Sequence, residues 1–202
     1  VKELAKEAGV DVEDPAAVAR FDRHRKDRKT SNKEWYNPDD PDAKVGRTKD
    51  GACDMIYKPE HIVDLESGAI IAAEVRPGDA GDTADLSARV MDAVELVEEI
   101  YGQDHVAEAS HVKDLTGDKG FHSPVELGII QEATGVRTII GDPNAERRQP
   151  ANLEPEARRA VAKAARAVKS KSGKALLKKR GELIERGFAH VLDCGGLRRT
   201  TL

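Results

Sequence analysis

Two carboxylates lie where a fold could present them to a ligand. Asp118 follows a short β-rich segment and precedes a strong helix start, with Gly117 and Gly120 on either side of it. Glu185 lies on a predicted helix, about 80° around the helical wheel from Leu177, at the border of the apolar stripe. In α/β proteins the carboxyl ends of strands are where ligands bind. Each residue has a plainer alternative: a turn residue for Asp118, and a surface ion pair for Glu185.

Carboxylates on two different elements suit a divalent cation. Mg²⁺ takes oxygen ligands and keeps several of its waters, and Mn²⁺ ranks above it at sites of mixed ligands. Two such ions can hold the attacking and the leaving oxygens of an in-line phosphoryl transfer. Asp118 and Glu185 are therefore candidate metal ligands, and their residue types are compatible with Mg²⁺ or Mn²⁺ as the cofactor and with phosphoryl transfer as the chemistry, although their spacing alone does not establish a site.

Other residues carry weaker indications. His190 and Cys194 lie four positions apart in the sequence and could contact a metal, but two ligands do not make a zinc site. His122 could contact a phosphate or be an exposed histidine at a helix start. Trp35 could stack on a base or anchor its loop. We interpret the segment around Asp142, between Gly141 and Pro143, as a turn only.

The charge distribution indicates the class of partner. The net charge is -4, but from Asn144 onward 15 Lys and Arg stand against 6 Asp and Glu, while the rest of the chain is acidic. A basic end on an acidic body favours a polyanion such as nucleic acid, with a solvated helix surface as the alternative. Double-stranded DNA is the predicted partner. The residues assigned to DNA binding are Arg158, Arg159, Lys163, Arg166, Lys178, Arg180 and Arg186.

The composition excludes several other classes of protein. Hydrophobic residues make up 39% and charged residues 35% of the 202-residue chain, and no apolar run reaches the ~18 residues of a membrane span. Aromatic residues are only 3%, which predicts an aliphatic core. The two cysteines are far apart in sequence and suggest no disulfide framework. We therefore expect a cytoplasmic protein without a membrane partner.

The N-terminal part is predicted to be a helical arm with an extended loop, residues 1–51. Val1–Lys29 indicates two short helices, the second capped by Asp14 with Pro15 at its first position. Thr30–Gly51 shows little periodicity and is rich in Asn, Asp, Pro and Gly, which predicts a loop.

Residues 52–202 are predicted to form an α/β domain. Met55–Leu65 and Ala69–Val75 indicate a hairpin. The following elements are a helix to about Tyr101 with a stripe of Leu86, Val90, Val94, Val97 and Tyr101, a strand over His111–Thr116, a helix from a capping box at Ser123 to Gly135, and a strand over Val136–Ile140. Alternating strands and helices favour a sheet with helices packed against it.

Two basic helices complete the predicted domain. Glu156–Lys171 has a weak apolar face, and Ser172-Gly173 separates it from a second helix over Lys174–Asp193. The predicted buried faces are Val161, Ala164, Ala165 and Val168 on the first helix, and Leu177, Ile184, Phe188 and Val191 on the second. The second stripe should face the sheet.

Five stretches of the sequence share motifs with one protein family. They resemble, in the family's order, parts of the DDE transposases of bacterial insertion sequences, whose catalytic domain is RNase H-like. Together they extend over most of the chain from Thr30 onward. The stretches are Thr30–Trp35, Asn37–Lys44, Tyr57–Asp64, Gly117–Ser123 and Arg180–His190.

This resemblance implies a fold and a set of catalytic residues. Asp118 matches the second acidic residue of the family's triad, in a motif where Phe121 stands in place of the usual tyrosine, and Glu185 matches the terminal glutamate. The first aspartate of the family, on an opening strand, has no counterpart, and Asp64 is interpreted as a strand-end residue. The expected fold is a mixed RNase H-like sheet lacking its first strand, apparently truncated at both ends.

The implied activity is metal-dependent DNA cleavage and strand transfer at transposon ends. With one ligand missing, the alternative is an inactive remnant that binds only DNA or a full-length partner. A different RNase H-like nuclease is a third, more remote alternative. A sheet without its central strand leaves edges unpaired, so self-association is also expected.

Overall fold

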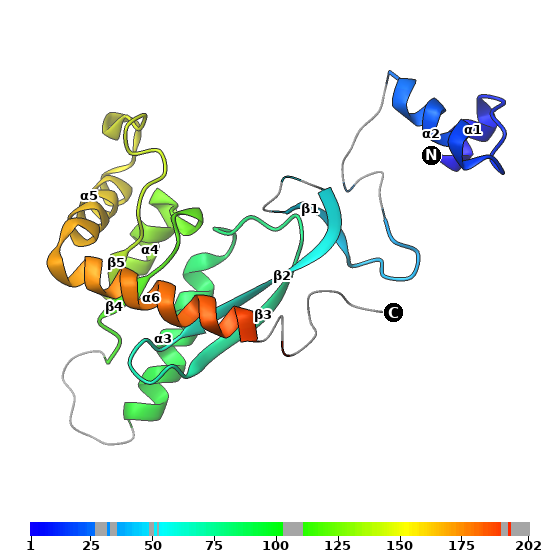
Figure 1. Ribbon diagram of the computed structural model, residues 1–202. Coiled ribbons are helices and arrows are strands. Elements are labelled where there is room, and N and C mark those ends of the chain that lie inside the picture. Colours follow the sequence, from blue (N-terminus) through cyan, green and yellow to red (C-terminus); the bar gives the residue numbers. More distant parts are fainter. Residues whose placement is uncertain are drawn as a thin grey trace. The chain divides into compact units, whose positions relative to one another are not determined.

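The structure, a computed structural model, describes residues 1–26, 32, 36–48, 51, 53–102, 111–190 and 194. Helices and strands are mixed along this part of the chain, which confirms the α/β class (Figure 1). The elements are α1 (Lys2–Glu7), α2 (Pro15–His24), β1 (Lys44–Arg47), β2 (Cys53–Val63), β3 (Ile70–Pro77), α3 (Leu86–Gly102), β4 (Asp114–Thr116), the 3-10 turn η1 (Lys119–Phe121), α4 (Pro124–Thr134), β5 (Arg137–Ile139), the 3-10 turn η2 (Pro150–Asn152), α5 (Pro155–Lys169) and α6 (Lys171–Ala189).

The chain divides into two compact units. The first consists of Val1–Lys58 with Arg76–Asp79, and the second of Pro59–Val75 with Ala80–Leu202. The division falls within both strands of the β2–β3 hairpin. All the candidate site residues belong to the second unit.

The first unit contains a strand that the sequence did not predict. β1 lies inside the segment predicted to be a loop, and it pairs antiparallel with the start of β2. The side chain of Asn32 forms two hydrogen bonds with the backbone of Val45, which lies on β1. It accepts from the Val45 amide at 2.6 Å and donates to the Val45 carbonyl at 3.2 Å. An amide side chain thus provides the pairing that a neighbouring strand would give. The predicted α2 start is confirmed, since Asp14 accepts from the Ala16 amide.

The predicted hairpin is confirmed, and its turn is held by an aspartate. β2 and β3 are neighbours in a three-stranded sheet of order β1-β2-β3. Asp64 accepts hydrogen bonds from the backbone amides of Glu66 and Ser67 and from the Ser67 hydroxyl. Gly68 completes the turn with a φ of 78°, a conformation that favours glycine.

The second unit has a separate parallel pair of strands. β4 and β5 pair in parallel and are connected through η1 and α4. One mixed sheet was predicted, whereas the described strands form a three-stranded and a two-stranded sheet. Because β4 and β5 run in the same direction, the residues that follow both strands lie at one edge of the pair. The segments after Thr116 and after Ile139 therefore meet.

Small aliphatic side chains form the core of this unit, as the low aromatic content predicts. Leu115 and Phe121 contact two clusters of buried residues and so join them. The clusters are Leu127, Ile140, Ala160 and Ala164, and Leu86, Val90 and Ile130. The stripe predicted on α3 is buried only in its first half, since Tyr101 is 55% exposed.

The two C-terminal helices differ from their predicted faces. On α5 the buried residues are Ala157, Ala160, Ala164 and Ala167, so only Ala164 of the predicted face is buried. The break between the helices is at Ser170, which caps α6 by accepting from the Gly173 amide, and Ser172-Gly173 lies inside α6. The stripe of α6 is only half-buried at Leu177, Ile184 and Phe188, and Val191 lies outside the described residues.

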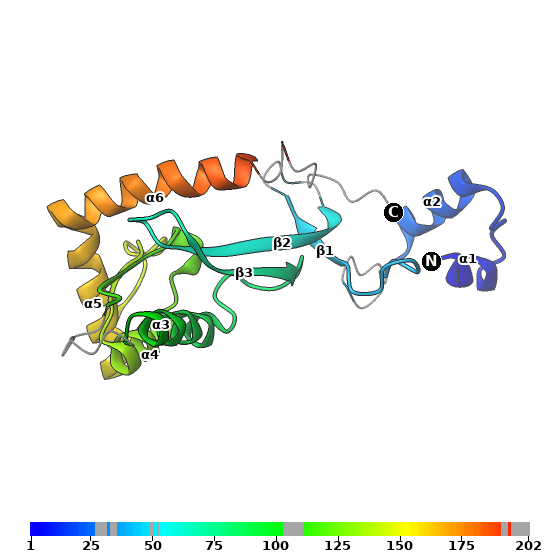
Figure 2. The same cartoon turned by 90° about the horizontal axis from the view of Figure 1, so that it is seen from below.

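Residues 59–75 of the hairpin lie between α6 and α3 (Figure 2). Glu60 forms an ion pair with Arg89 of α3. His61 stacks on Phe188 of α6, with ring centroids 4.7 Å apart and planes 4° apart. Successive residues of a strand point to opposite faces, so Glu60 contacts α3 on one face of the strand and His61 contacts α6 on the other.

The start of α4 also supports the start of α3. Ser123 caps α4 as predicted, accepting from the Glu126 amide, and Gly135 ends the helix with a φ of 70°. The Glu126 carboxylate accepts a hydrogen bond from the Ser87 amide in the first turn of α3, at 2.8 Å. A carboxylate stabilises a helix N-terminus through its unpaired amides and its dipole.

Replacing Glu126 by glutamine is expected to lower the free energy of unfolding by about 1 kcal/mol, because the Ser87 amide loses a charged acceptor. Urea denaturation measures this effect. Glu132→Gln on an exposed position of the same helix is the matched control and should change stability by less than about 0.5 kcal/mol. Equal effects in both variants would mean that the Glu126 carboxylate does not stabilise α3.

Candidate metal and nucleic-acid sites

Asp118 lies on the turn that follows β4. Its backbone is extended, and its Oδ1 accepts a hydrogen bond from the Lys119 amide at 2.8 Å, which caps η1. A side chain at Gly117 would lie 3.0 Å from Cδ1 of Ile140, so the ends of the two strands are in close contact. Asp118 itself is exposed. The structure therefore places it at the carboxyl edge of the parallel pair, where it also serves as a turn residue.

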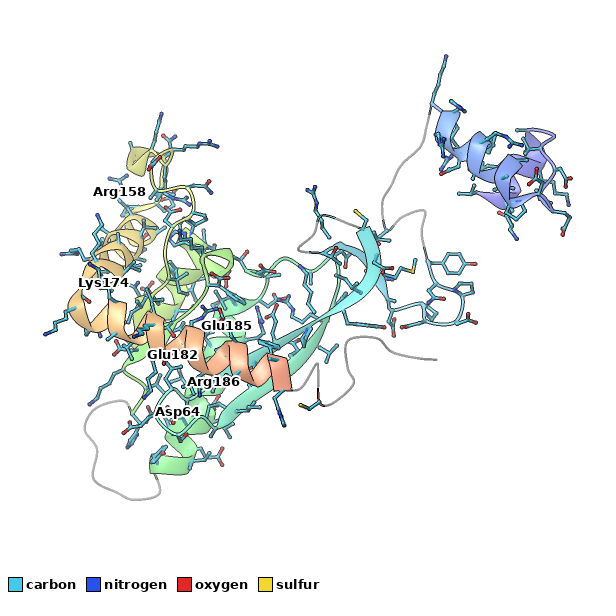
Figure 3. All side chains as sticks on the ribbon, viewed as in Figure 1. Asp64, Arg158, Lys174, Glu182, Glu185 and Arg186 are labelled. Atoms are coloured by element: carbon cyan, nitrogen blue, oxygen red, sulfur yellow. The ribbon has the colours of Figure 1, made fainter. Side chains whose placement is uncertain are left out.

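Glu185 lies on α6, a helix that contacts β4. Its side chain is exposed, and Figure 3 labels it together with Glu182 and Arg186 on the same helix. Glu182 is 4.0 Å from the ammonium of Lys178, one turn earlier on the helix. That Asp118 and Glu185 hold a metal together stays a prediction.

Asp118 and Glu185 provide carboxylate oxygens as possible metal ligands. Carboxylate oxygens are the ligand type that Mg²⁺ prefers, and it is commonly held by one or two of them with water and phosphate oxygens. Among the described residues, no group of three or more His, Cys, Asp or Glu is arranged to hold a metal. The protein ligands among the described residues therefore fall short of a complete metal site. His190 and Cys194 are both exposed.

Asp64 serves the hairpin turn. Its three hydrogen bonds come from Ser67 and Glu66, and these bonds lower the pKa of the Asp64 carboxyl, with a smaller contribution from the charge of Lys179 on α6. A carboxylate with this many donors has a local structural role. This agrees with its interpretation as a strand-end residue.

A buried cluster of titratable groups lies at the same edge of β4 and β5 and was missed by the sequence analysis. The side chain of His122 is only 1% exposed, and its Nδ1 lies 3.7 Å from Oδ1 of Asp142. Asp142, 6% exposed, accepts from Nε of Arg148 at 2.5 Å and from its Nη2 at 3.1 Å. His122 is thus a buried residue and not an exposed histidine at a helix start. Asp142, which was predicted to be a turn residue only, also forms an ion pair with Arg148.

The cluster lowers two pKa values, those of His122 and Asp142. Burial lowers the pKa of His122, which favours the neutral imidazole. The hydrogen bonds from Arg148 lower the pKa of the Asp142 carboxyl and favour the carboxylate. In the described part of the molecule, Nδ1 of His122 has no hydrogen-bond partner. The sequence holds no clear signal for this cluster, because twenty positions separate His122 from Asp142.

The predicted DNA-binding residues of α5 fall into two groups. Arg158 donates to the Leu153 carbonyl at 3.0 Å, and Arg159 pairs with Glu156 at 3.2 Å, so both stabilise the first turn of their own helix. Lys163 and Arg166 are exposed and have no acidic partner among the described residues. These two charges are available to an anion.

On α6 the remaining three predicted DNA contacts, Lys178, Arg180 and Arg186, are exposed or half-exposed. Figure 3 labels Arg158 and Lys174 on the two basic helices. Neither α5 nor α6 carries an unpaired acidic cluster that would offset these cations in the described part of the chain.

Residues from separate motif stretches contact each other. In the first unit, the Tyr57 hydroxyl donates to Asp40 at 2.7 Å, and this hydrogen bond raises the pKa of Tyr57 to about 12. In the second unit, the stacked His61 and Phe188 come from two different stretches. Trp35 and most of the first stretch lie outside the described residues.

Comparison with protein-family models, with curated proteins and with solved structures gave no match. Within the described residues, none of the helices has the length and apolar character needed to cross a membrane.

Proposed function

We propose that this chain is part of the catalytic domain of a DDE transposase, which cleaves DNA and joins its strands during transposition of an insertion sequence. The observation that carries the proposal is the position of Asp118 immediately after a strand of a parallel pair, with the helix that bears Glu185 in contact with that strand. Ligands of α/β proteins bind at such strand ends.

The strand arrangement supports an RNase H-like sheet. In that fold a further strand would lie between the antiparallel strands and the parallel pair. The described strands fall into just these two groups. The contact between His61 and Phe188 adds support, because it joins two of the stretches that resemble the family.

In this proposal Asp118 and Glu185 would hold Mg²⁺ or Mn²⁺ next to the scissile phosphate, where the metal would supply stabilisation of the charge on the phosphoryl oxygens. The cations of α5 and α6 neutralise the DNA backbone. The first acidic ligand has no counterpart in this chain, so activity requires that it be supplied from elsewhere. Such a protein would act in the bacterial cytoplasm.

A second candidate function is a remnant that binds DNA or a full-length partner without catalysis. It is favoured by the exposed and unpaired Lys163 and Arg166, which suit DNA binding whether or not a metal is held. Metal dependence separates the two functions. Binding of a DNA duplex that is equal in Mn²⁺ and in chelator is expected for the remnant.

The metal site is tested by thermal melting with and without Mn²⁺. A ligand at ten times its Kd stabilises the folded state by about 1.4 kcal/mol, so the midpoint of the parent protein should rise. Asp118→Asn and Glu185→Gln should each abolish most of that rise. Glu182→Gln, three residues from Glu185 on the same helix, is the matched control and should keep it.

Two results would contradict this site. One is a rise of equal size in the parent, Asp118→Asn and Glu185→Gln. The other is an experimental structure with the two carboxylates on opposite faces of the strands.

A further inference from the structure

A polar groove lies between β5 and the C-terminal half of α5. It has a volume of about 600 Å³, and residues from the C-terminus of α4 contribute to its lining. The polar and charged side chains among its lining residues are Gln131, Arg137, Thr138, Lys163, Arg166 and Ser170. We call it the β5–α5 groove. Three of the six are cations, and no carboxylate lines the groove.

Most of this positive charge is uncompensated. Arg137 pairs through Nε with Asp114 at 2.5 Å, and its Nη1 donates to Ser172 at 3.3 Å. Lys163 and Arg166 have no acidic partner in the described part of the chain. Among the described residues, the three cations of the groove are therefore paired with one carboxylate, that of Asp114, which lies outside the groove lining.

Two of the lining side chains, Gln131 and Thr138, belong to a hydrogen-bonded network. The Gln131 amide donates to the Thr138 hydroxyl at 2.6 Å and to the Ala160 carbonyl at 3.3 Å, so it ties α4, β5 and α5 together. The guanidinium groups of two arginines and the ammonium of a lysine in this groove match the oxygens of a phosphate, which arginine can bind in a bidentate manner.

The neighbouring charges favour a polymer over a single small anion. Arg159, Lys163 and Arg166 lie along one flank of α5 and span about 10 Å at 1.5 Å per residue. A row of cations of this length suits the repeated charges of a DNA backbone. The groove is at one end of this row.

We propose that the β5–α5 groove binds one backbone phosphate of DNA, held by Lys163 and Arg166 with Arg137 as a third donor. This inference rests on the DNA-binding part of the proposed function and extends it to Arg137, which the charge pattern alone did not select. It does not depend on the candidate metal ligands.

The first experiment uses inorganic phosphate at constant ionic strength and follows the backbone amides of the full chain by NMR. Saturable shifts are expected at Arg137, Thr138 and Ser170. They should be lost in the double variant Lys163→Gln with Arg166→Gln. The matched control is Lys169→Gln with Lys174→Gln, which removes the same charge from exposed positions of α5 and α6 outside the groove. It should keep the shifts.

The second experiment measures the affinity of a short duplex as a function of salt. Loss of one phosphate contact lowers affinity about eightfold at 0.1 M salt and reduces the salt slope by about 0.9. The groove variant should show both changes, and the control variant clearly smaller ones. Equal losses in the two variants would overturn the inference, since only overall charge would then matter.

The remaining outcomes separate the groove from the proposed function. Saturable phosphate shifts without any duplex binding would overturn DNA as the partner while supporting a phosphate site for a small molecule. Duplex binding without phosphate shifts, and with the groove variant unchanged, would overturn the groove and leave the proposed function standing.

Discussion

Replacing Gly173 by alanine is expected to lower the free energy of unfolding by about 3 kcal/mol, the largest effect of any substitution considered. An ideal Cβ at this position would lie 2.0 Å from the carbonyl oxygen of Ala167 and 2.9 Å from its carbonyl carbon. Both atoms belong to the backbone at the end of α5, so no side-chain rotation relieves the overlap. The elbow between α5 and α6 would have to open.

Gly181 provides a matched control on the same helix. A Cβ there meets no atom within 4 Å, so Gly181→Ala should raise stability by about 0.5–1 kcal/mol through the lower entropy of its unfolded chain. Urea denaturation of both variants measures the difference. If Gly173→Ala were as stable as Gly181→Ala, the close approach of the two helices at Ser170 would be wrong.

The second large effect is expected at Asp142. Asp142→Asn should lower the free energy of unfolding at neutral pH by about 2–3 kcal/mol, because it removes the charged acceptor of the half-buried Arg148. Urea denaturation of the variant against the parent checks this value. Glu146→Gln, an exposed change in the same loop, is the control and should have little effect.

The pH dependence follows from the direction of each shift. The pKa of Asp142 is lowered in the folded state, so its stabilisation is present above its unfolded pKa of about 3.9 and is lost as the pH falls through the folded pKa. The pKa of His122 is lowered by burial, so the unfolded state takes up the proton first. Stability should therefore fall as the pH decreases below about 6.5.

His122→Gln tests the histidine contribution. This variant should show a flatter loss of stability between about pH 7 and about pH 5 than the parent. His24→Gln, an exposed histidine of α2, should leave the parent's slope unchanged. A slope for His122→Gln equal to that of the parent would show that His122 does not contribute to the acid sensitivity.

Local signals were sufficient to predict most helix and strand positions. The capping residues Asp14 and Ser123 and the terminal Gly135 act within one turn of the chain, so their effect is visible in sequence. The hairpin turn is equally local, since Asp64 and Gly68 form it by themselves. β1 was missed because it has only four residues, one of them Gly46, and it is defined by its pairing with the start of β2.

The packing faces required knowledge of the partner surface. On α5 the larger Val161 and Val168 suggested the buried side, but Ala157 lies opposite Gly128 of α4, where a Cβ would be 3.7 Å from its backbone. Two helices that approach this closely leave space only for small side chains such as alanine at their contact. Hydrophobicity alone favours the wrong side of such a helix.

In the candidate site, too, some positions could be predicted from the sequence and others could not. The position of Asp118 at a strand end could be predicted, because it depends on a strand and a helix start that flank it directly. The His122–Asp142–Arg148 cluster could not, because its members come from the segments after two different strands. Their contact requires the parallel pairing of β4 and β5.

The alternating contacts of Glu60 and His61 also protect β2 against misfolding. A shift of the strand by one residue would turn each side chain to the opposite face. A shift in one direction would bring His61 into the place of Glu60 beside Arg89, and a shift in the other would bring the charge of Glu60 into the place of His61 beside the ring of Phe188. Both new contacts are unfavourable, so these two residues specify the register of a strand whose neighbour β3 is largely exposed and offers few packing contacts to define it.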